Sequence, residues 1–359
     1  MDAIGAGARV KSVAVGALIA LVGACLSCRA HLPLPWLLGP LLASAALHLA
    51  GGRAAPPTTL RNAGQLVVGA AVGLAFRPAV AALALSLWPL VLANAVATIA
   101  LGGAGAWLLH RWTRLDLRTC YLSAAIGGAS DMQALADRFG AEADAVGAAQ
   151  VLRVVLVVLV VPMAMRWCVG DDGASAGDAT AAAFSATGFA TLLAVAGAAG
   201  WVARRMDVPN AWGIAPLLAS CACAASGLEP GAVPAAVLHT GQLAVGWSLG
   251  SRFAPGFFAT RPRFLVAVAV YTLGVLLAAA LVAAVLGGLA GESFPSLVLG
   301  AAPGGVAEMS LTARTLDLDV ALVASMQLTR IVAGAVVTAP LLALLQRRLQ
   351  RDRERATSR

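Results

Sequence analysis

The chain has 359 residues, of which 60% are hydrophobic and only 12% are charged, and its mean hydropathy is +0.85. Soluble globular domains carry about 25% charged residues, so the composition excludes a soluble protein. The apolar runs are continuous and reach the roughly 20 residues that a transmembrane helix needs. Membrane β-strands instead alternate apolar and polar residues over about 10 positions. We therefore predict an all-α polytopic membrane protein.

The net charge of +8 does not indicate a nucleic-acid partner. Nearly all positive residues are arginines, and Lys11 is the single lysine. They fall in short clusters between apolar runs and in a basic tail at 348–359. The positive-inside rule predicts this distribution for cytoplasmic loops. The expected partner of the chain is therefore the lipid bilayer, and both termini are expected on the cytoplasmic side.

The side chains that most often carry enzyme chemistry are scattered. The six cysteines and four histidines form no ligand set with the spacing of a zinc site. The sequence contains no phosphate-binding loop, no G-x-S-x-G and no H-E-x-x-H. We expect no metal, no cofactor and no catalytic residues, and interpret the cysteines as small apolar residues inside helices.

Taken in order, the first half of the chain contains six predicted apolar segments, at 12–27, 34–50, 62–76, 80–109, 119–136 and 145–167. The second half contains six more, at 187–203, 211–227, 237–253, 264–289, 295–313 and 321–346. The segments of the two halves correspond one to one at a nearly constant spacing. The repetition indicates a tandem duplication, which we divide into a first repeat (10–168), a polar joint (169–185), a second repeat (186–347) and the tail (348–359).

Three pairs of motifs support this duplication. Trp36-x-x-x-Pro40-Leu-Leu-Ala-Ser returns as Trp212-x-x-x-Pro216-Leu-Leu-Ala-Ser, and Gly64-Gln65-Leu-x-x-Gly69-x-x-x-Gly73 returns as Gly241-Gln242-Leu-x-x-Gly246-x-x-x-Gly250. The third pair joins Gly127-Gly128-Ala-Ser130-Asp131-Met to Gly304-Gly305-Val-Ala-Glu308-Met. The internal prolines should kink the second segments, and the small-x-x-x-small glycines favour close helix packing in lipid.

The fifth segment of each half, which contains the Gly-Gly pair, decides the topology. If it enters and leaves the membrane on one side, each half crosses five times, and the second half is inverted relative to the first. The arginine clusters then lie inside and the acidic loops outside, with Arg29 and Arg77 as exceptions. A broken helix that crosses the membrane is the alternative. We predict inverted repeats with a re-entrant fifth segment.

Acidic residues inside membrane segments are rare and mark ion, proton or substrate paths. Glycine allows the backbone to leave helical geometry, and such backbone is tolerated at membrane depth only where protein or a water-filled cavity surrounds it. The predicted ion- or substrate-binding residues are Gly127, Gly128, Ser130, Asp131, Gln150, Arg153, Gly304, Gly305, Glu308, Gln327 and Arg330. The alternative places the two acids at the water interface as helix N-caps.

The arginines follow a glutamine in Gln150-x-x-Arg153 and Gln327-x-x-Arg330, so both side chains lie on one helix face. We expect each guanidinium to pair with a carboxylate of its own half or to bind a carboxylate substrate. A purely structural arginine–acid pair is the alternative. Secondary candidates are Gln65, Gln242 and His239, for which packing roles are the alternative.

The duplicated W-x-x-x-P-L-L-A-S, G-Q-L-x-x-G-x-x-x-G and G-G-x-x-[DE]-M patterns resemble those of the AbrB-type duplicated bacterial membrane proteins over nearly the whole chain. Members of that family are labelled transcriptional regulators or ammonia monooxygenases, and the resemblance implies a link to regulation of gene expression. It implies no catalytic residues. Nothing in the sequence matches the small β-rich AbrB DNA-binding unit or the metal ligands of a monooxygenase.

Two functions follow from these patterns. The first is a secondary transporter of the bacterial inner membrane for a small solute such as a carboxylate, coupled to H⁺ or Na⁺; transporters of this size are often homodimers. The second is a membrane sensor that acts in regulation of gene expression. A sensor needs an output domain or partner, and the longest cytoplasmic piece is the basic tail. Deleting residues 349–359 should abolish a tail-mediated signal and leave transport intact. Bound metal in the purified protein would instead indicate an enzyme.

Overall fold

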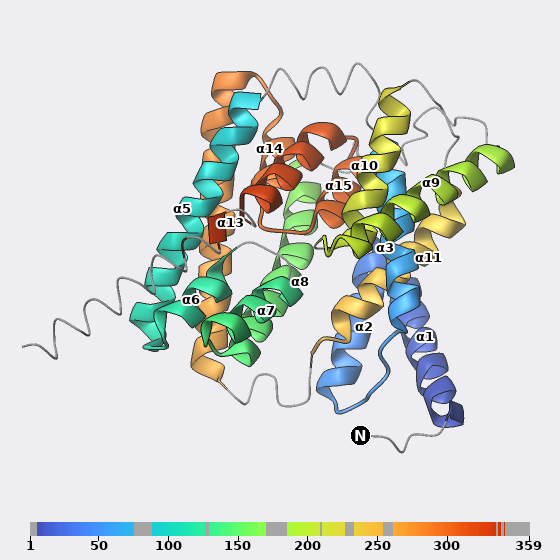
Figure 1. Ribbon diagram of the computed structural model, residues 1–359, viewed down its shortest axis with the longest axis horizontal. Coiled ribbons are helices and arrows are strands. Elements are labelled where there is room, and N and C mark those ends of the chain that lie inside the picture. Colours follow the sequence, from blue (N-terminus) through green and yellow to red (C-terminus); the bar gives the residue numbers. More distant parts are fainter. Residues whose placement is uncertain are drawn as a thin grey trace, which may run out of the picture.

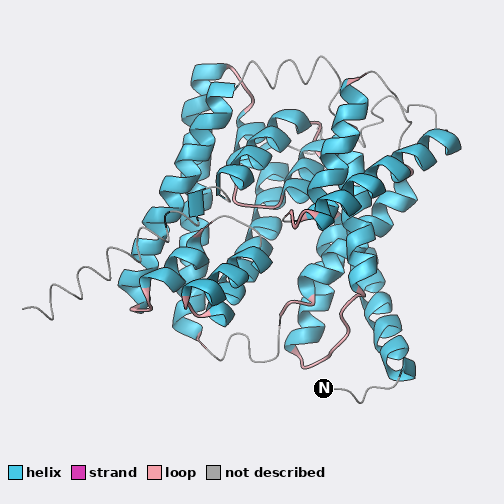
Figure 2. Cartoon of the chain, in the orientation of Figure 1, coloured by secondary structure: helices cyan, strands magenta, loops and turns pink. Residues whose placement is uncertain are grey.

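The computed structural model describes residues 6–74, 88–125, 129–169, 185–208, 210–226, 233–253, 261–334, 337–338 and 341. Within these residues every regular element is an α-helix (Figure 2). Five described helices are long and apolar enough to cross a membrane, at Lys11–Arg29, Trp88–Thr113, Ala143–Val169, Ala186–Arg205 and Pro262–Gly288. The predicted all-α polytopic membrane fold is confirmed.

The helices follow the predicted segments closely. The first half contains α1 (Ala6–Arg29), α2 (Pro35–Leu49), α3 (Thr58–Gly73), α5 (Trp88–Thr113), α6 (Leu117–Ala124), α7 (Ala129–Phe139) and α8 (Ala143–Val169). The second half contains α9 (Ala186–Arg205), α10 (Ala211–Ala225), α11 (Ala235–Gly250), α13 (Pro262–Ala290), α14 (Phe294–Ala301), α15 (Val306–Thr315) and the helix Val320–Gly334. In each half the fifth predicted segment is a pair of short helices rather than one.

Several segments are too short to span a bilayer as straight helices. Both α2 and α10 have 15 residues. At 1.5 Å per residue such a helix is about 22 Å long, whereas the hydrocarbon core is about 30 Å thick. The five crossings per half therefore stay a prediction.

The helices sort into two groups, which Figure 1 shows on the two sides of the molecule. The scaffold bundle consists of α1, α2, α3, α9, α10 and α11, and within it α3 packs on α10 and α2 on α11. The hairpin bundle consists of α5 to α8 and α13 to α15, in which α13 packs on both α5 and α8. The bundles meet where α15 contacts α3 and α8 contacts α11. Each bundle therefore draws its helices from both halves of the chain.

Glycines set the close contacts between the halves. A Cβ atom on Gly69 of α3 would clash with the carbonyl oxygen of Gly213 in α10, and one on Gly246 of α11 would clash with that of Leu37 in α2. Gly69 and Gly246 are equivalent positions of the two repeats, and so are Leu37 and Gly213. Each half thus makes the same contact with the other.

The backbone conformation repeats as well. Positive φ angles are uncommon outside glycine, yet they occur in pairs at equivalent positions of the two repeats. The paired residues are His31 and Asp207, Leu34 and Asn210, Arg114 and Gly291, and Gly140 and Asp317. These unusual turns end or begin matching helices. The two halves therefore share local geometry, and the inversion of the second half relative to the membrane stays a prediction.

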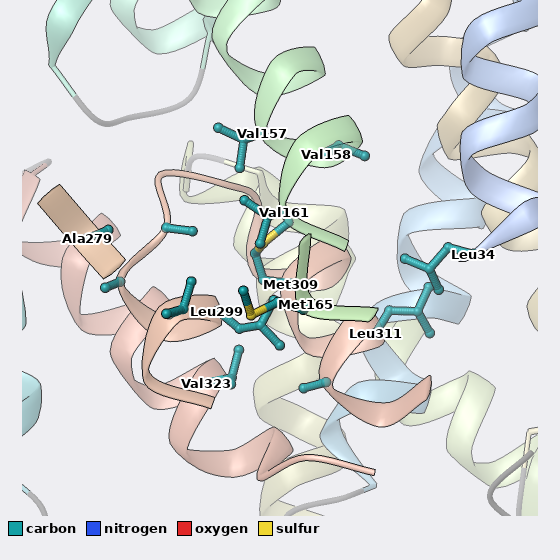
Figure 3. Close-up of a cluster of buried hydrophobic side chains, with 14 of the residues drawn as sticks. Leu34, Val157, Val158, Val161, Met165, Ala279, Leu299, Met309, Leu311 and Val323 are labelled. Carbon is teal, nitrogen blue, oxygen red and sulfur yellow. The ribbon is translucent and has the colours of Figure 1, made fainter. Parts of the chain in front are cut away.

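The largest apolar core lies in the hairpin bundle and extends to the scaffold bundle. Figure 3 shows Val161 of α8 beside Met309 of α15, with Val157 further along α8, and Leu34 reaches toward Leu311 from the scaffold. Large apolar side chains on the outer faces of α1, α5 and α13 remain exposed. Contiguous exposed apolar surface of this kind is what a lipid bilayer covers.

Candidate functional site

Each fifth segment is broken in extended backbone. In the second half α14 ends at Ala301, Ala302 is extended with ψ 137°, and Gly305, with ψ 148°, is the N-cap of α15. In the first half α6 ends at Ala124, and Ala125 is extended with ψ 141°. Of the predicted site residues, Gly127 and Gly128 lie outside the described residues, as do the side chains of Ser130 and Asp131.

The two short helices of each pair turn back on one another. In the first pair, the Glu142 backbone N–H after α7 donates to Thr119 Oγ1 at the start of α6 over 3.1 Å. In the second, the Asp319 N–H donates to Ser296 Oγ over 3.2 Å. These two bonds join equivalent positions of the two repeats. The entrance and exit of each segment are therefore adjacent, and we call the two units the first and second hairpin; Figure 1 shows α6 and α7 low in the view and α14 and α15 high.

The end of α14 is held by a glutamine and an arginine from the helix Val320–Gly334. Gln327 Nε2 donates to the carbonyl oxygens of Leu299 over 2.6 Å and Ala302 over 3.0 Å. Arg330 donates to the carbonyl oxygen of Ala302, to that of Gly304 over 2.6 Å, and to Gln327 Oε1. Both side chains are buried. They satisfy carbonyl groups that a helix end leaves without partners.

The first hairpin repeats the arrangement with residues of α8. Gln150 Nε2 donates to the carbonyl oxygens of Leu122 over 2.7 Å and Ala125 over 3.0 Å. Arg153 donates to the Ala125 oxygen over 2.8 Å and to Gln150 Oε1 over 2.6 Å. We call the pairs Gln150–Arg153 and Gln327–Arg330 the two Gln-Arg clamps. Each clamp holds the broken backbone of its own half.

The sequence did not predict these contacts, and the expected pairing of each arginine with a carboxylate of its own half or of a substrate stays a prediction, because the Asp131 side chain lies outside the described residues. Among the described residues, the hydrogen bonds of both guanidinium groups go to backbone carbonyls and to glutamine. The physical reason is that the C-terminal end of a half-helix carries about half a negative charge, and buried carbonyls without partners are costly. The clamps therefore have a structural role in the hairpins.

The two clamps lie near each other in the hairpin bundle. Arg153 and Arg330 lie near enough for their positive charges to repel each other. In each arginine the Nε atom is buried and has no hydrogen-bond partner among the described residues. The two breaks thus meet inside the hairpin bundle, where two buried positive charges face the negative ends of two half-helices.

Glu308 lies in the first turn of α15, three residues after the N-cap Gly305. Its carboxylate folds back over Gly305, where a side chain would clash with Glu308 Oε2. The Asp131 backbone occupies the corresponding position in α7. Both acids are therefore placed at the N-terminus of a half-helix, where the helix dipole favours negative charge, and both are next to a break.

The sequence motifs did not identify the basic residue that lies near Glu308. The Glu308 carboxylate attracts the charge of Arg252, which follows α11 in the scaffold bundle, and Arg252 is in turn repelled by Arg61 of α3. The Nε atom of Arg61 is buried without a partner among the described residues. In addition, Arg314 of α15 donates to the Ala71 carbonyl oxygen of α3 over 3.3 Å. The positive-inside rule placed Arg61 and Arg252 in loop clusters, and no motif linked them to the acid.

The secondary candidates lie in the scaffold bundle. His239 stacks on Trp36, with ring centroids 4.9 Å apart and planes 7° apart, and so packs α11 on α2. Gln242 is buried and Gln65 is half-buried, each next to the glycine where α3 and α11 touch. No hydrogen bond among the described residues joins these three side chains to the clamps. The described part of the chain also contains no group of three His, Cys, Asp or Glu side chains that could hold a metal ion.

Comparison with known proteins places the chain in one family. A family model described as "Transition state regulatory protein AbrB" matches residues 36–346. The chain is similar to an uncharacterized protein, YhjN, of Bacillus subtilis (strain 168), with 28% identity over 298 residues, which is 79% of this chain and 77% of the relative. It is also similar to "Putative regulator AbrB" of Escherichia coli (strain K12), with 27% identity over 320 residues, 87% of this chain and 90% of the relative. The chain, with its paired hairpins and Gln-Arg clamps, belongs to the AbrB family.

Proposed function

We propose that the protein is a secondary transporter of the bacterial inner membrane that moves a small anionic solute, such as a carboxylate, together with H⁺ or Na⁺. The observation that carries this proposal is the pair of matched broken hairpins, each with an acid at the first turn after the break. Discontinuous helices at matched positions in two halves are the usual form of a transporter's central site. We expect both termini in the cytoplasm and a homodimer.

The hairpin ends differ in what they offer a ligand. Half-helix C-termini can hold cations through their carbonyl groups, and N-termini can hold anions through free N–H groups. The Gln-Arg clamps already occupy the carbonyl groups of α6 and α14. The acids at the N-termini of α7 and α15 are then the groups left for the coupling ion, so in this proposal Asp131 and Glu308 bind H⁺ or Na⁺.

The charges at the bundle junction supply a coupling mechanism. Ionised Glu308 attracts Arg252 across the junction. Binding of H⁺ or Na⁺ neutralises Glu308 and frees Arg252, with the neighbouring Arg61, to take up an anion, because guanidinium groups bind carboxylates in bidentate geometry. Cation and anion would then enter together, and displacement of the hairpin bundle against the scaffold bundle would carry both across. This displacement rests on architectural analogy.

Ligand binding can be tested by the melting temperature of the purified protein in detergent, scanned over pH, Na⁺ and a panel of small mono- and dicarboxylates. A ligand at 100 times its Kd stabilises the folded state by about 2.7 kcal/mol. We expect one carboxylate to raise the melting temperature in the presence of the coupling ion. Glu308→Gln and Asp131→Asn should lose this response, and Asp207→Asn, which changes an exposed acid, should keep it. If no ligand stabilises the parent protein, the binding site is absent.

The name of the Escherichia coli relative favours a second candidate, a sensor that acts in regulation of gene expression. In a sensor the same hairpins would bind the solute, and the tail 348–359 or a partner protein would pass on the signal. Both candidates therefore predict ligand binding, and they differ in whether the solute crosses the membrane.

A further inference from the structure

A small cavity of about 20 Å³ lies beside the break of the first hairpin. Three hydroxyl side chains line it, those of Thr98 on α5, Tyr121 on α6 and Thr338. Ala125, at the break, also lines it. A buried water needs roughly 10–15 Å³ of such space, so the cavity has room for one water-sized molecule.

The hydroxyl groups are buried deeply. Thr98 and Tyr121 are 6% exposed, and Thr338 is 3% exposed. The Tyr121 hydroxyl lies near the Thr338 side chain, and the Thr98 hydroxyl has no hydrogen-bond partner within the described part of the chain. A threonine hydroxyl can donate one hydrogen bond and accept two. The cavity wall therefore offers donors and acceptors that the protein itself does not fully use.

The duplication provides an internal comparison. The residues that match Thr98, Tyr121 and Thr338 in the other half are Val275, Val298 and Val161. Val298 and Val161 belong to the apolar core around the second hairpin, together with Ala279 and Ala302, which match Gly102 and Ala125. Apolar side chains fill the place in the second hairpin where the first hairpin has three hydroxyls. The hydroxyls are therefore a property of one half and are not required by the shared fold.

The charge nearby decides what the cavity can hold. The Arg153 guanidinium lies 2.8 Å from the carbonyl oxygen of Ala125, a cavity-lining residue, and in a low-dielectric interior it repels a second cation. None of the described residues that line the cavity carries a carboxylate to offset that repulsion. A neutral molecule has no such penalty, and buried waters typically make about three hydrogen bonds. We propose that this cavity is a binding site for one water molecule, held by the Thr98, Tyr121 and Thr338 hydroxyls.

The test uses the melting temperature of the full-length protein in detergent. Thr98→Val replaces a hydroxyl by a methyl group of similar size. If water is bound, this variant removes one of its partners and should melt below the parent. If the cavity is dry, the same change removes a hydroxyl from an apolar space and should leave the melting temperature unchanged or raise it. That outcome would overturn the proposal.

A second variant fills the cavity instead of changing its hydroxyls. Gly102 lines the cavity, and a Cβ atom there would meet its nearest atoms only at 3.9 Å, so Gly102→Ala fits and displaces the water. In the Gly102→Ala background, Thr98→Val should no longer lower the melting temperature. An unchanged loss in that background would contradict water binding.

Sodium is compared with choline as the salt cation in both sets of variants. A sodium-dependent rise that Thr98→Val abolishes would assign the cavity to a cation and overturn the water site. The transport proposal stands or falls separately, because its sodium response should depend on Glu308 and Asp131.

Discussion

Replacing Arg330 by alanine is expected to lower the free energy of unfolding by about 3 kcal/mol, because each buried acceptor left without a partner costs about 1–3 kcal/mol. Arg330 is 1% exposed and donates to the carbonyl oxygens of Ala302 and Gly304 and to Gln327 Oε1. Loss of a buried charge that Arg153 repels offsets part of the cost. The melting temperature of the purified protein measures the effect.

The comparison variants make this prediction specific. Arg330→Lys should recover little of the stability, because an ammonium group lacks the planar fork that reaches a carbonyl and a glutamine together. Arg153→Ala should cause a similar loss through the first clamp. Arg263→Ala changes an exposed arginine and should have little effect. If Arg330→Ala melts like Arg263→Ala, the clamp does not hold the hairpin.

The two hairpins are expected to open to opposite sides of the membrane, which gives an all-or-none labelling pattern. In a variant without the six native cysteines, single cysteines are introduced at exposed positions on either side of each hairpin. Arg111→Cys and Asp137→Cys flank the first hairpin, and Gly288→Cys and Thr315→Cys flank the second. A membrane-impermeant maleimide added to intact spheroplasts should label the second pair and leave the first pair unlabelled until the membrane is opened.

The labelling of the two positions within each pair tests whether the fifth segment enters and leaves the membrane on one side. Equal accessibility of the two positions that flank one hairpin follows from the bonds that tie its ends, Glu142 N–H to Thr119 and Asp319 N–H to Ser296. Opposite accessibility within a pair would mean that the fifth segment crosses the membrane. Labelling of all four positions from one side would show that the halves are parallel repeats.

Much of this architecture could be predicted because the sequence contains it twice. Apolar length located the helices, and the Gly-Gly pairs located the breaks, since an ordinary apolar helix has no reason to contain them at matched positions. The constant spacing of the two repeats identified Gln150 with Gln327 and Arg153 with Arg330 before any geometry was known. Repetition therefore predicted which residues are equivalent.

Repetition could not predict what those residues bind. An arginine near an acid in an apolar sequence suggests an ion pair. The carbonyl groups at the ends of α6 and α14 become available to the arginines only because the segments break and turn back, which the sequence does not show directly. Arg252 lies near Glu308 because α15 packs on the scaffold bundle, and no periodic signal encodes this proximity. The hydroxyl cavity departs from the repeat, so it shows only when both halves are compared in space.

Transport requires that a solute cross the membrane through this protein. We would reconstitute the parent and Glu308→Gln in proteoliposomes and measure uptake of radiolabelled small carboxylates under imposed pH and Na⁺ gradients. We expect saturable uptake of one carboxylate by the parent, driven by one of the two gradients and lost in Glu308→Gln, with Asp207→Asn as active as the parent. A carboxylate that stabilises the protein in detergent but never enters the vesicles would contradict transport and favour the sensor function.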